Sequence, residues 1–229
     1  MASNPTSTSD RPRRRSPGNR PSDDTLLDAA CAVFHATGFA AAGMDAIAAA
    51  ADTTKPTLYA HFGSKDGVYQ ACLRREAAKF RAALFETYDS AAALNLRQEV
   101  RTDMTVFYEY AAAHPIGFGL LFDEGRSEPN AEVCGELVDS LTERIAHRIR
   151  TYAATHRHLE PSRSAELLAA MLVGIAVHGA RQSLRLGTDM IAAGELAAAM
   201  ANAALFHLDP QVFEAADSSG GRGETRPES

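Results

Sequence analysis

The stretch ADTTKPTLYAHFGSK, from Ala51 to Lys65, places a proline inside a segment of otherwise helical character. Its first half is polar and rich in hydroxyl groups, and its second half is aromatic. Proline is tolerated in the first turn of a helix because the N–H groups there have no intrahelical partner. Thr54 stands where a side-chain oxygen caps such a turn. The stretch therefore predicts a short helix over residues 54–62 that opens with hydrogen-bonding side chains.

A second short helix is predicted directly upstream, from about Met44 to Ala51, with Ile47 facing inward. Two short helices joined by a tight turn form a helix-turn-helix, whose second helix reads DNA with its N-terminal side chains. Leu58 and Phe62 lie four residues apart in that second helix, so they are expected to pack on the helix before it.

The reading helix and its flanks supply hydroxyl, aromatic, imidazole and ammonium groups that suit phosphate oxygens or base edges. The next helix begins at Ser64-Lys65 and adds N–H groups that favour an anion. For His61 the alternative is a satisfied interior position. The predicted DNA contacts are Gly43, Thr53, Thr54, Lys55, Pro56, Thr57, Tyr59, His61 and Lys65.

The segment MDAIAAAADTTKPTLYAHFGSKDGVYQACL, which begins at Met44, resembles the DNA-binding signature of TetR-family transcriptional regulators. The resemblance covers about residues 22–72; beyond them it lies only in the number and order of helices. The matching positions are Ile47-Ala48, Ala51-Asp52, Thr54, Leu58-Tyr59-Ala60-His61-Phe62 and Ser64-Lys65. Three positions depart from the family pattern. Asp52 replaces the usual turn glycine, Gly43 replaces a capping Ser or Thr, and Gly67 weakens the first turn of the fourth helix.

The resemblance implies a homodimer that binds a palindromic double-stranded DNA operator and responds to a small-molecule effector. It predicts a repressor that the ligand releases from DNA. An activator, or a regulator without a ligand, is the alternative within this class. The alternative from another class is a helical binding protein or enzyme that keeps the helix-turn-helix only as structure.

The remaining chain shows only helical periodicity, and its many alanines favour helix. The predicted fold is all-α with about nine helices: an N-terminal three-helix DNA-binding domain followed by a helical domain for ligand binding and dimerisation. Beyond Ser64, which caps a long helix to about Ser90, helices are expected at about 96–113, 115–123, 130–155, 162–186 and 190–207. The predicted division is a disordered basic arm (1–21), the helix-turn-helix domain (22–68), the helical domain (69–216) and a disordered tail (217–229).

Charge is unevenly distributed along the chain. The formal net charge is −6, yet residues 1–65 hold seven Arg and Lys against six Asp and Glu. Five of those cations lie between Arg11 and Arg20. An acidic body with a locally basic end suits a protein of which one part approaches a polyanion. The arginines of the arm either form a solvated tail or contact the DNA minor groove or phosphates.

A ligand cavity among the fourth to eighth helices follows from the resemblance, and such cavities are mostly apolar. Most aromatic residues of the helical domain are expected to form its core, and PIGFGLLF (Pro115–Phe122) is a candidate mobile gate. His178 has three alternatives: ligand contact, dimer contact or satisfied burial. The predicted ligand contacts are Phe85, Tyr88, Phe107, Tyr110, Phe118, Phe122 and His178.

Helices 162–186 and 190–207 are rich in small and apolar residues on several faces, which one small body cannot cover. Pairing with their symmetry mates would bury them in a four-helix bundle. The predicted dimer contacts are Ala169, Leu172, Val173, Ala176, Ala180, Leu196, Met200 and Ala203.

Other classes of function lack support in the sequence. No HExxH, GxSxG, P-loop or dinucleotide-binding pattern is found, so we expect no enzyme, no metal and no cofactor. Cys31, Cys72 and Cys134 are interpreted as buried reduced thiols of a cytoplasmic protein. No secretory signal and no apolar run near the ~18 residues of a membrane span is found, so no membrane partner is expected.

Overall fold

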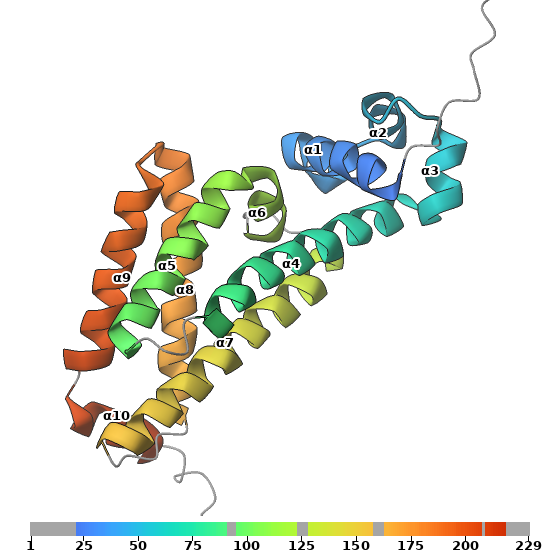
Figure 1. Cartoon of the computed structure of the whole chain (residues 1–229). Coiled ribbons are helices and arrows are strands. Elements are labelled where there is room, and N and C mark those ends of the chain that lie inside the picture. The colour runs from blue at the N-terminus through green and yellow to red at the C-terminus, as the bar shows by residue number, and fades with distance from the viewer. Residues whose placement is uncertain (1–21, 91–94, 123–127, 158–162, 208, 219–229) are drawn as a thin grey trace, which may run out of the picture.

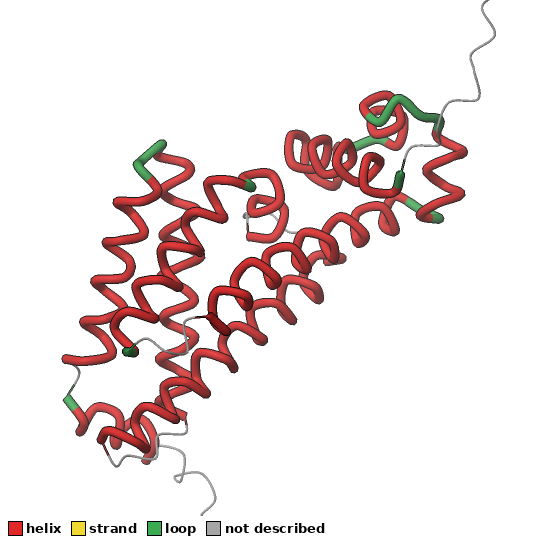
Figure 2. Tube along the Cα trace, in the orientation of Figure 1, coloured by secondary structure: helices red, strands yellow, loops and turns green. Residues whose placement is uncertain are grey.

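The computed structural model describes residues 22–90, 95–122, 128–157, 163–207 and 209–218. The predicted basic arm, and the tail beyond Ser218, lie outside this part of the chain. The described residues form ten helices and turns, with no strand among them (Figure 2). The all-α prediction is confirmed.

The N-terminal domain consists of α1 (Asp23–Ala41), α2 (Met44–Ala50) and α3 (Lys55–Phe62). Ser22 caps α1 by accepting a hydrogen bond from the Thr25 N–H, and the first-turn carboxylates complement the helix dipole. Gly38 interrupts α1 at φ 76°, ψ 160°, a conformation that favours glycine, so regular helix ends there as predicted.

One long helix, α4 (Lys65–Ser90), runs from the N-terminal domain into the rest of the molecule (Figure 1). It is followed by α5 (Leu96–Ala113), α6 (Pro115–Phe122), α7 (Glu128–Arg157), α8 (Arg163–Leu186) and α9 (Met190–His207). The helix predicted over about 130–155 thus begins slightly earlier, at Glu128.

A tenth helix, α10 (Pro210–Ser218), was not predicted. It packs against α8, where the Asp217 carboxylate accepts hydrogen bonds from the N–H and hydroxyl groups of Ser164 at 2.9 and 2.8 Å. Asp217 and Ser218 were expected to belong to a disordered tail, and that expectation is wrong for these two residues. This contact joins residues 53 positions apart in the sequence, so the local pattern does not reveal it.

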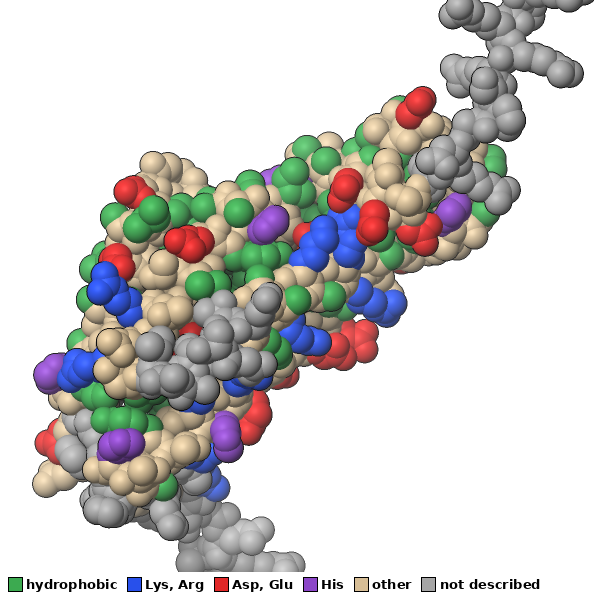
Figure 3. All heavy atoms as spheres, viewed as in Figure 1, with side chains coloured by type: hydrophobic (Ala, Val, Ile, Leu, Met, Phe, Trp, Pro, Cys, Tyr) green, Lys and Arg blue, Asp and Glu red, His purple; other side chains and the backbone are tan. Residues whose placement is uncertain are grey.

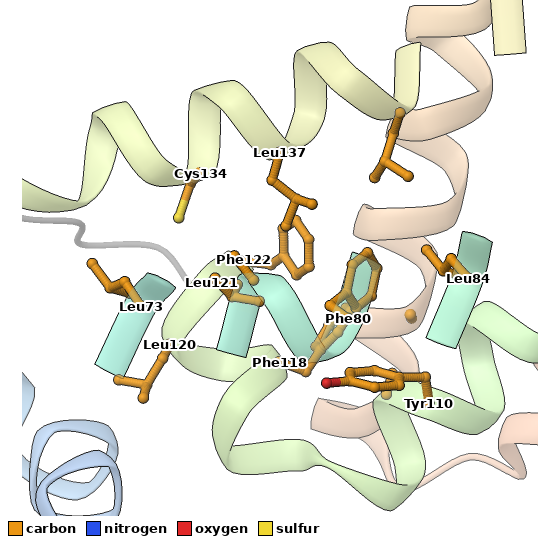
Figure 4. Close-up of a cluster of buried hydrophobic side chains, with 14 of the residues drawn as sticks. Leu73, Phe80, Leu84, Tyr110, Phe118, Leu120, Leu121, Phe122, Cys134 and Leu137 are labelled. Carbon is orange, nitrogen blue, oxygen red and sulfur yellow. The ribbon is translucent and has the colours of Figure 1, made fainter. Parts of the chain in front are cut away.

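An aromatic cluster forms the core of the helical domain where α4, α5 and α6 meet under α7 (Figure 4). Phe80 of α4 lies edge-on to Phe107 and Phe122, at centroid distances of 5.3 Å each. Phe118 packs against the same rings. This cluster fixes α6 between the long helix and α5.

By length and composition alone, α8 and α9 are apolar enough to cross a membrane. The sequence analysis had found no apolar run of that length and so did not identify these two helices. Within the fold both helices pack against α5, and α8 also packs against α7. Only about a third of the most apolar 18-residue stretch of each helix is buried, so each helix also presents apolar side chains outward.

Candidate nucleic-acid interface

The turn between α2 and α3 sets the angle of the predicted reading helix. Asp52 occupies it in the left-handed region at φ 46°, a conformation that aspartate tolerates better than most residues. Thr54 then caps α3, its hydroxyl accepting from the Thr57 N–H at 3.4 Å, and Pro56 lies in the first turn. Gly43 begins α2 without a side-chain cap. The local geometry follows the sequence prediction at each of these positions.

Leu58 and Ile47 are fully buried, and they join α3 to α2 through the core of the N-terminal domain. Phe62 is partly buried against that core. The predicted DNA contacts lie around the apolar side of α3 and are exposed or half-buried. Tyr59, for example, is exposed over 44% of its surface. The structure thus brings the nine candidates together on one end of the molecule, at the upper right in Figure 1.

Lys55 is paired within the helix-turn-helix. Its Nζ donates to Asp45 Oδ2 of α2 at 3.1 Å, and both side chains are largely exposed. The sequence analysis did not identify Asp45. A carboxylate in the first turn of α2 was the available signal, but nothing in the sequence shows that it lies beside Lys55, ten residues later.

His61 lies within hydrogen-bond distance of Asp23 of α1, at 2.6 Å between Nδ1 and Oδ1. The contact connects the end of the reading helix to the beginning of α1. Asp23 is itself exposed, so the interior alternative for His61 does not describe this site.

Lys65 has two contacts that the sequence did not indicate. Its Nζ donates to the Ala40 carbonyl oxygen at 3.1 Å and lies 4.7 Å from the centroid of the Phe39 ring. The ammonium group therefore holds the end of α1 against the beginning of α4. Lys65 is only partly buried, so these contacts leave part of the side chain open to a phosphate.

Arg75 joins α1 to α4 farther along. It donates to the Asp24 carbonyl oxygen at 3.0 Å, and it pairs with Asp28 at 2.8 Å and with Glu76 at 2.9 Å. Acidic and basic side chains lie next to one another where α1 meets α4 (Figure 3). The side chain of Glu76 is only 7% exposed. Its partners Arg75 and Lys79 compensate the buried charge.

Cys31 and Cys72 are buried beside Arg75 on α1 and α4, and they are free thiols. A hydrogen bond from Cys72 and the nearby Arg75 charge lower the pKa of Cys31 despite its burial. The same hydrogen bond and burial raise the pKa of Cys72. Cys134 is also a buried free thiol.

The predicted ligand contacts divide between the core and the surface. Phe107, Tyr110, Phe118 and Phe122 lie in the buried aromatic cluster, and Phe85 packs at its edge. The side chain of Tyr88 lies outside the described residues. The Tyr110 hydroxyl is buried without a hydrogen-bond partner in the described structure. Burial, together with the Glu76 charge, raises the pKa of Tyr110 to about 12.

His178 is exposed and lies apart from that cluster. It lines a surface groove of about 560 Å³ between α8 and α9, together with Leu196 and Met200. Exposure excludes satisfied burial from its three alternatives.

The predicted dimer contacts lie on two different faces. The five on α8 are buried against the protomer's own core, with Ala169 and Ala180 fully covered. They cannot contact a partner in this conformation, which corrects the prediction. The three on α9 are exposed, Leu196 over 64% of its surface. On α8 the exposed large apolar residues are instead Leu167, Met171 and Leu186.

Among the described residues, no group of three or more His, Cys, Asp or Glu side chains is placed to hold a metal ion. The chemistry at this end of the molecule is that of hydroxyl, imidazole and ammonium groups around a short exposed helix. Such groups suit hydrogen bonds to phosphate oxygens and base edges.

Comparison with known proteins gives concordant results. The family model for bacterial regulatory proteins of the tetR family matches residues 26–72. The HTH-type transcriptional activator FasR of Mycolicibacterium smegmatis is 35% identical over 173 residues, which are 72% of this chain and 74% of that protein.

Solved structures that share the fold include two further regulators. A TetR-like transcriptional regulator from Rhodococcus sp. RHA1 is 30% identical, with a TM-score of 0.67 over 80% of this chain and 94% of that one. The fatty acid degradation regulator FadR from Bacillus halodurans is 16% identical, with a TM-score of 0.65 over 81% and 99% of the two chains. The second similarity concerns the fold alone.

Proposed function

This chain belongs to the TetR family of DNA-binding transcriptional regulators, and from that premise we propose that it is a homodimeric repressor released from a palindromic operator by a small molecule. The observation that supports this most directly is the position of α3. The reading helix is exposed at the end of the molecule, and the α4 helix that follows it continues into the helical domain (Figure 1).

The proposed DNA contacts are those predicted from the sequence. Thr57 and Lys55, near the start of α3, are proposed to contact base edges, as expected for a reading helix. Tyr59, His61 and Lys65 flank that helix and are proposed to contact the backbone. A positive N-terminus of α4 adds to the attraction for phosphate.

Control by a ligand requires a coupling free energy between the two domains, and the coupling acts equally in both directions. The contacts that could carry it are present. Arg75 of α4 reaches α1 on one side. Its ion-pair partner Glu76 lies against Gly117 of α6 on the other. We propose that a ligand at the aromatic cluster moves α6 and thereby shifts α4 and the reading helix.

The dimer face is proposed to be the exposed apolar surface of α8 and α9. It contains Met171 on α8 and Ile191, Leu196 and Met200 on α9, each at least half-exposed in the protomer. His178, in the groove between the same helices, is then a dimer contact. Exposed apolar side chains gathered on two neighbouring helices are typical of a protein–protein interface. Burial of α8 and α9 in a four-helix bundle also accounts for their apolar composition, which by itself would allow them to span a membrane.

An activator is the second candidate function, because the FasR relative carries that name at 35% identity. Either regulator acts where the chromosome is, so we propose a cytoplasmic location and no membrane partner. A repressor lowers transcription and an activator raises it, but the proposed fold and DNA contacts are the same for both.

The proposal is tested with the DNA upstream of the protein's own coding region. Size exclusion should give a dimer, and a footprint should cover two half-sites on one face of the duplex. Transcription from that promoter with purified RNA polymerase should fall as the protein is added. A rise in transcript would establish the activator instead, and failure to bind any genomic fragment would exclude both.

A further inference from the structure

Two free thiols, Cys31 of α1 and Cys72 of α4, are buried where these two helices pack together. Neither is among the residues proposed above to contact DNA, the small molecule or a second copy of the chain. The helices that carry them nevertheless join the DNA-binding domain to the helical domain. The thiol pair therefore lies at the junction between the domains without a role in the function proposed so far.

Contacts across the junction place the two sulfur atoms next to one another. The Cys72 Sγ lies 3.7 Å from the Leu27 carbonyl oxygen. In an α-helix that oxygen accepts from the N–H group four residues later, which here is that of Cys31. From the other side, the Arg75 guanidinium donates to the Cys31 Sγ at 3.6 Å, and Arg75 lies three residues after Cys72 on the same face of α4. Each sulfur thus contacts the helical turn that carries the other cysteine.

The two thiols differ in acidity. A hydrogen bond from Cys72 and the positive charge of Arg75 lower the pKa of Cys31, against the opposing effect of burial. The same hydrogen bond, together with burial, raises the pKa of Cys72. The thiolate is the nucleophile in cysteine chemistry. Cys31 is therefore suited to attack, and Cys72 keeps its proton until a later step.

Arg75 both orients and covers Cys31. Its guanidinium is held by Asp28 at 2.8 Å, by Glu76 at 2.9 Å and by the Asp24 carbonyl oxygen at 3.0 Å. Asp24 and Asp28 are exposed, whereas the Arg75 side chain is 13% exposed and Cys31 only 3%. Cys31 thus lies one side chain beneath the surface. A molecule as small as a peroxide reaches its sulfur when Arg75 moves aside.

We propose that Cys31 and Cys72 are a peroxide-sensitive pair that is oxidised to a disulfide between α1 and α4. The Cys31 thiolate attacks one oxygen of a hydroperoxide, the O–O bond breaks, and the departing oxygen takes up the former thiol proton to leave as an alcohol or water. The Cys72 sulfur then attacks the sulfenic acid on Cys31. The S–S bond forms, and the Cys72 proton leaves with the sulfenic hydroxyl as water. The two thiols lose two electrons and two protons, and the peroxide accepts both.

The disulfide changes how α1 and α4 pack. Bonded sulfurs lie about 2.05 Å apart, much closer than two separate thiols, so both helices must adjust around the bond. At its beginning α1 contacts the reading helix through Asp23 and His61, and at its end Lys65 of α4 donates to the Ala40 carbonyl oxygen. The adjustment is therefore expected to reach the reading helix and to weaken DNA binding.

The first experiment treats the reduced full-length protein with hydrogen peroxide and counts the thiols that remain. The count should fall from three to one, because the chain has three cysteines and two of them form the bond. Mass spectrometry of a digest without reductant should show one cross-link, between Cys31 and Cys72. Dithiothreitol should restore all three thiols.

Single substitutions separate the two roles. Cys72→Ser should stop the reaction at the Cys31 sulfenic acid, which dimedone traps. In Cys31→Ser, the remaining Cys72 should react with peroxide at least about tenfold more slowly than Cys31 does, because its pKa is raised. Cys134→Ser removes the third buried free thiol and is the matched control, which should still form the disulfide. Thermal unfolding checks that the variants fold, and the cross-link in the wild-type protein decides the site if one of them does not.

The second experiment measures DNA binding by fluorescence anisotropy, with the DNA upstream of the protein's own coding region as the probe. The oxidised protein should bind at least about fivefold more weakly than the reduced protein, the lower end of typical coupling between two sites. Dithiothreitol should restore the affinity. Cys31→Ser should keep its affinity after peroxide, whereas Cys134→Ser should lose it as the wild type does.

The outcomes separate this inference from the function proposed above, on which only the DNA measurement rests. Peroxide that consumes no thiol, or a cross-link that includes Cys134, would overturn the site. A disulfide between Cys31 and Cys72 that leaves DNA affinity unchanged would overturn its regulatory effect. A reduced protein that binds no DNA would refute the regulator, while the thiol count still decides the site.

Discussion

Lys55 of the reading helix forms a hydrogen-bonded ion pair with Asp45 of the preceding helix, at 3.1 Å. The pair holds one of the few cations of the DNA-binding surface and places a carboxylate beside the approaching polyanion. Exposed ion pairs of this kind contribute little to stability. Its consequence is therefore expected in DNA binding.

Asp45→Asn should strengthen binding to non-specific DNA by about threefold to tenfold, because it removes the repulsion between a carboxylate and the phosphates and leaves the charge of Lys55 uncompensated. The magnitude of the slope of log K against log salt should rise by about one. Fluorescence anisotropy at several salt concentrations measures both quantities. Asp139→Asn, an exposed carboxylate on α7, is the charge-matched control and should change neither.

Lys65→Ala distinguishes two roles of one ammonium group. Loss of the contacts to Ala40 and Phe39 should lower the free energy of unfolding by about 0.5–1.5 kcal/mol. If Lys65 also contacts a phosphate, affinity for all DNA sequences falls and the salt slope decreases by about one. If the salt slope is unchanged and stability is reduced, Lys65 stabilises the fold but does not contact a phosphate.

The dimer face is tested by Met171→Arg with Leu196→Arg, two exposed apolar side chains on α8 and α9. Like charges buried across the two-fold axis should give monomers, and operator affinity should fall at least about 100-fold as the second half-site is lost. Sedimentation and footprinting measure the two effects. Val212→Arg, an exposed apolar position on α10, should remain dimeric. A dimeric double variant would place the interface elsewhere.

Gly117→Ala tests the contact between α6 and α4. A Cβ there would meet the carboxylate of Glu76, which Arg75 and Lys79 hold in a nearly buried position. Overpacking should cost about 1–3 kcal/mol of unfolding free energy, measured in urea. Gly135→Ala on α7 has open space around its Cβ and should instead stabilise by about 0.5–1 kcal/mol. Equal effects of the two changes would contradict this account.

Local signals predicted the helix-turn-helix well. The Thr54 cap and the Leu58–Phe62 spacing gave α3 to within one residue, because both act within a single turn. Features that depend on distant contacts were missed. Asp45 reaches Lys55 only after the turn closes, and α10 is held to α8 through Asp217. On α8, apolar residues lie on more than one face, so helical spacing alone could not choose between the buried and the exposed stripe.

Asp103 should make stability depend on pH near 5. Burial outweighs the Arg148 charge and raises the pKa of Asp103 to about 6, from 3.8. The native state then holds a proton that the unfolded chain has released, so ionised Asp103 costs free energy above pH 6 and none well below pH 4. Asp103→Asn stays neutral throughout. The unfolding free energy of the wild type relative to this variant should therefore fall as pH rises from 4 to 7, by at most about 3 kcal/mol. Urea midpoints at several pH values measure this difference, and a difference that rises with pH would mean that the Arg148 pair, not burial, dominates at Asp103.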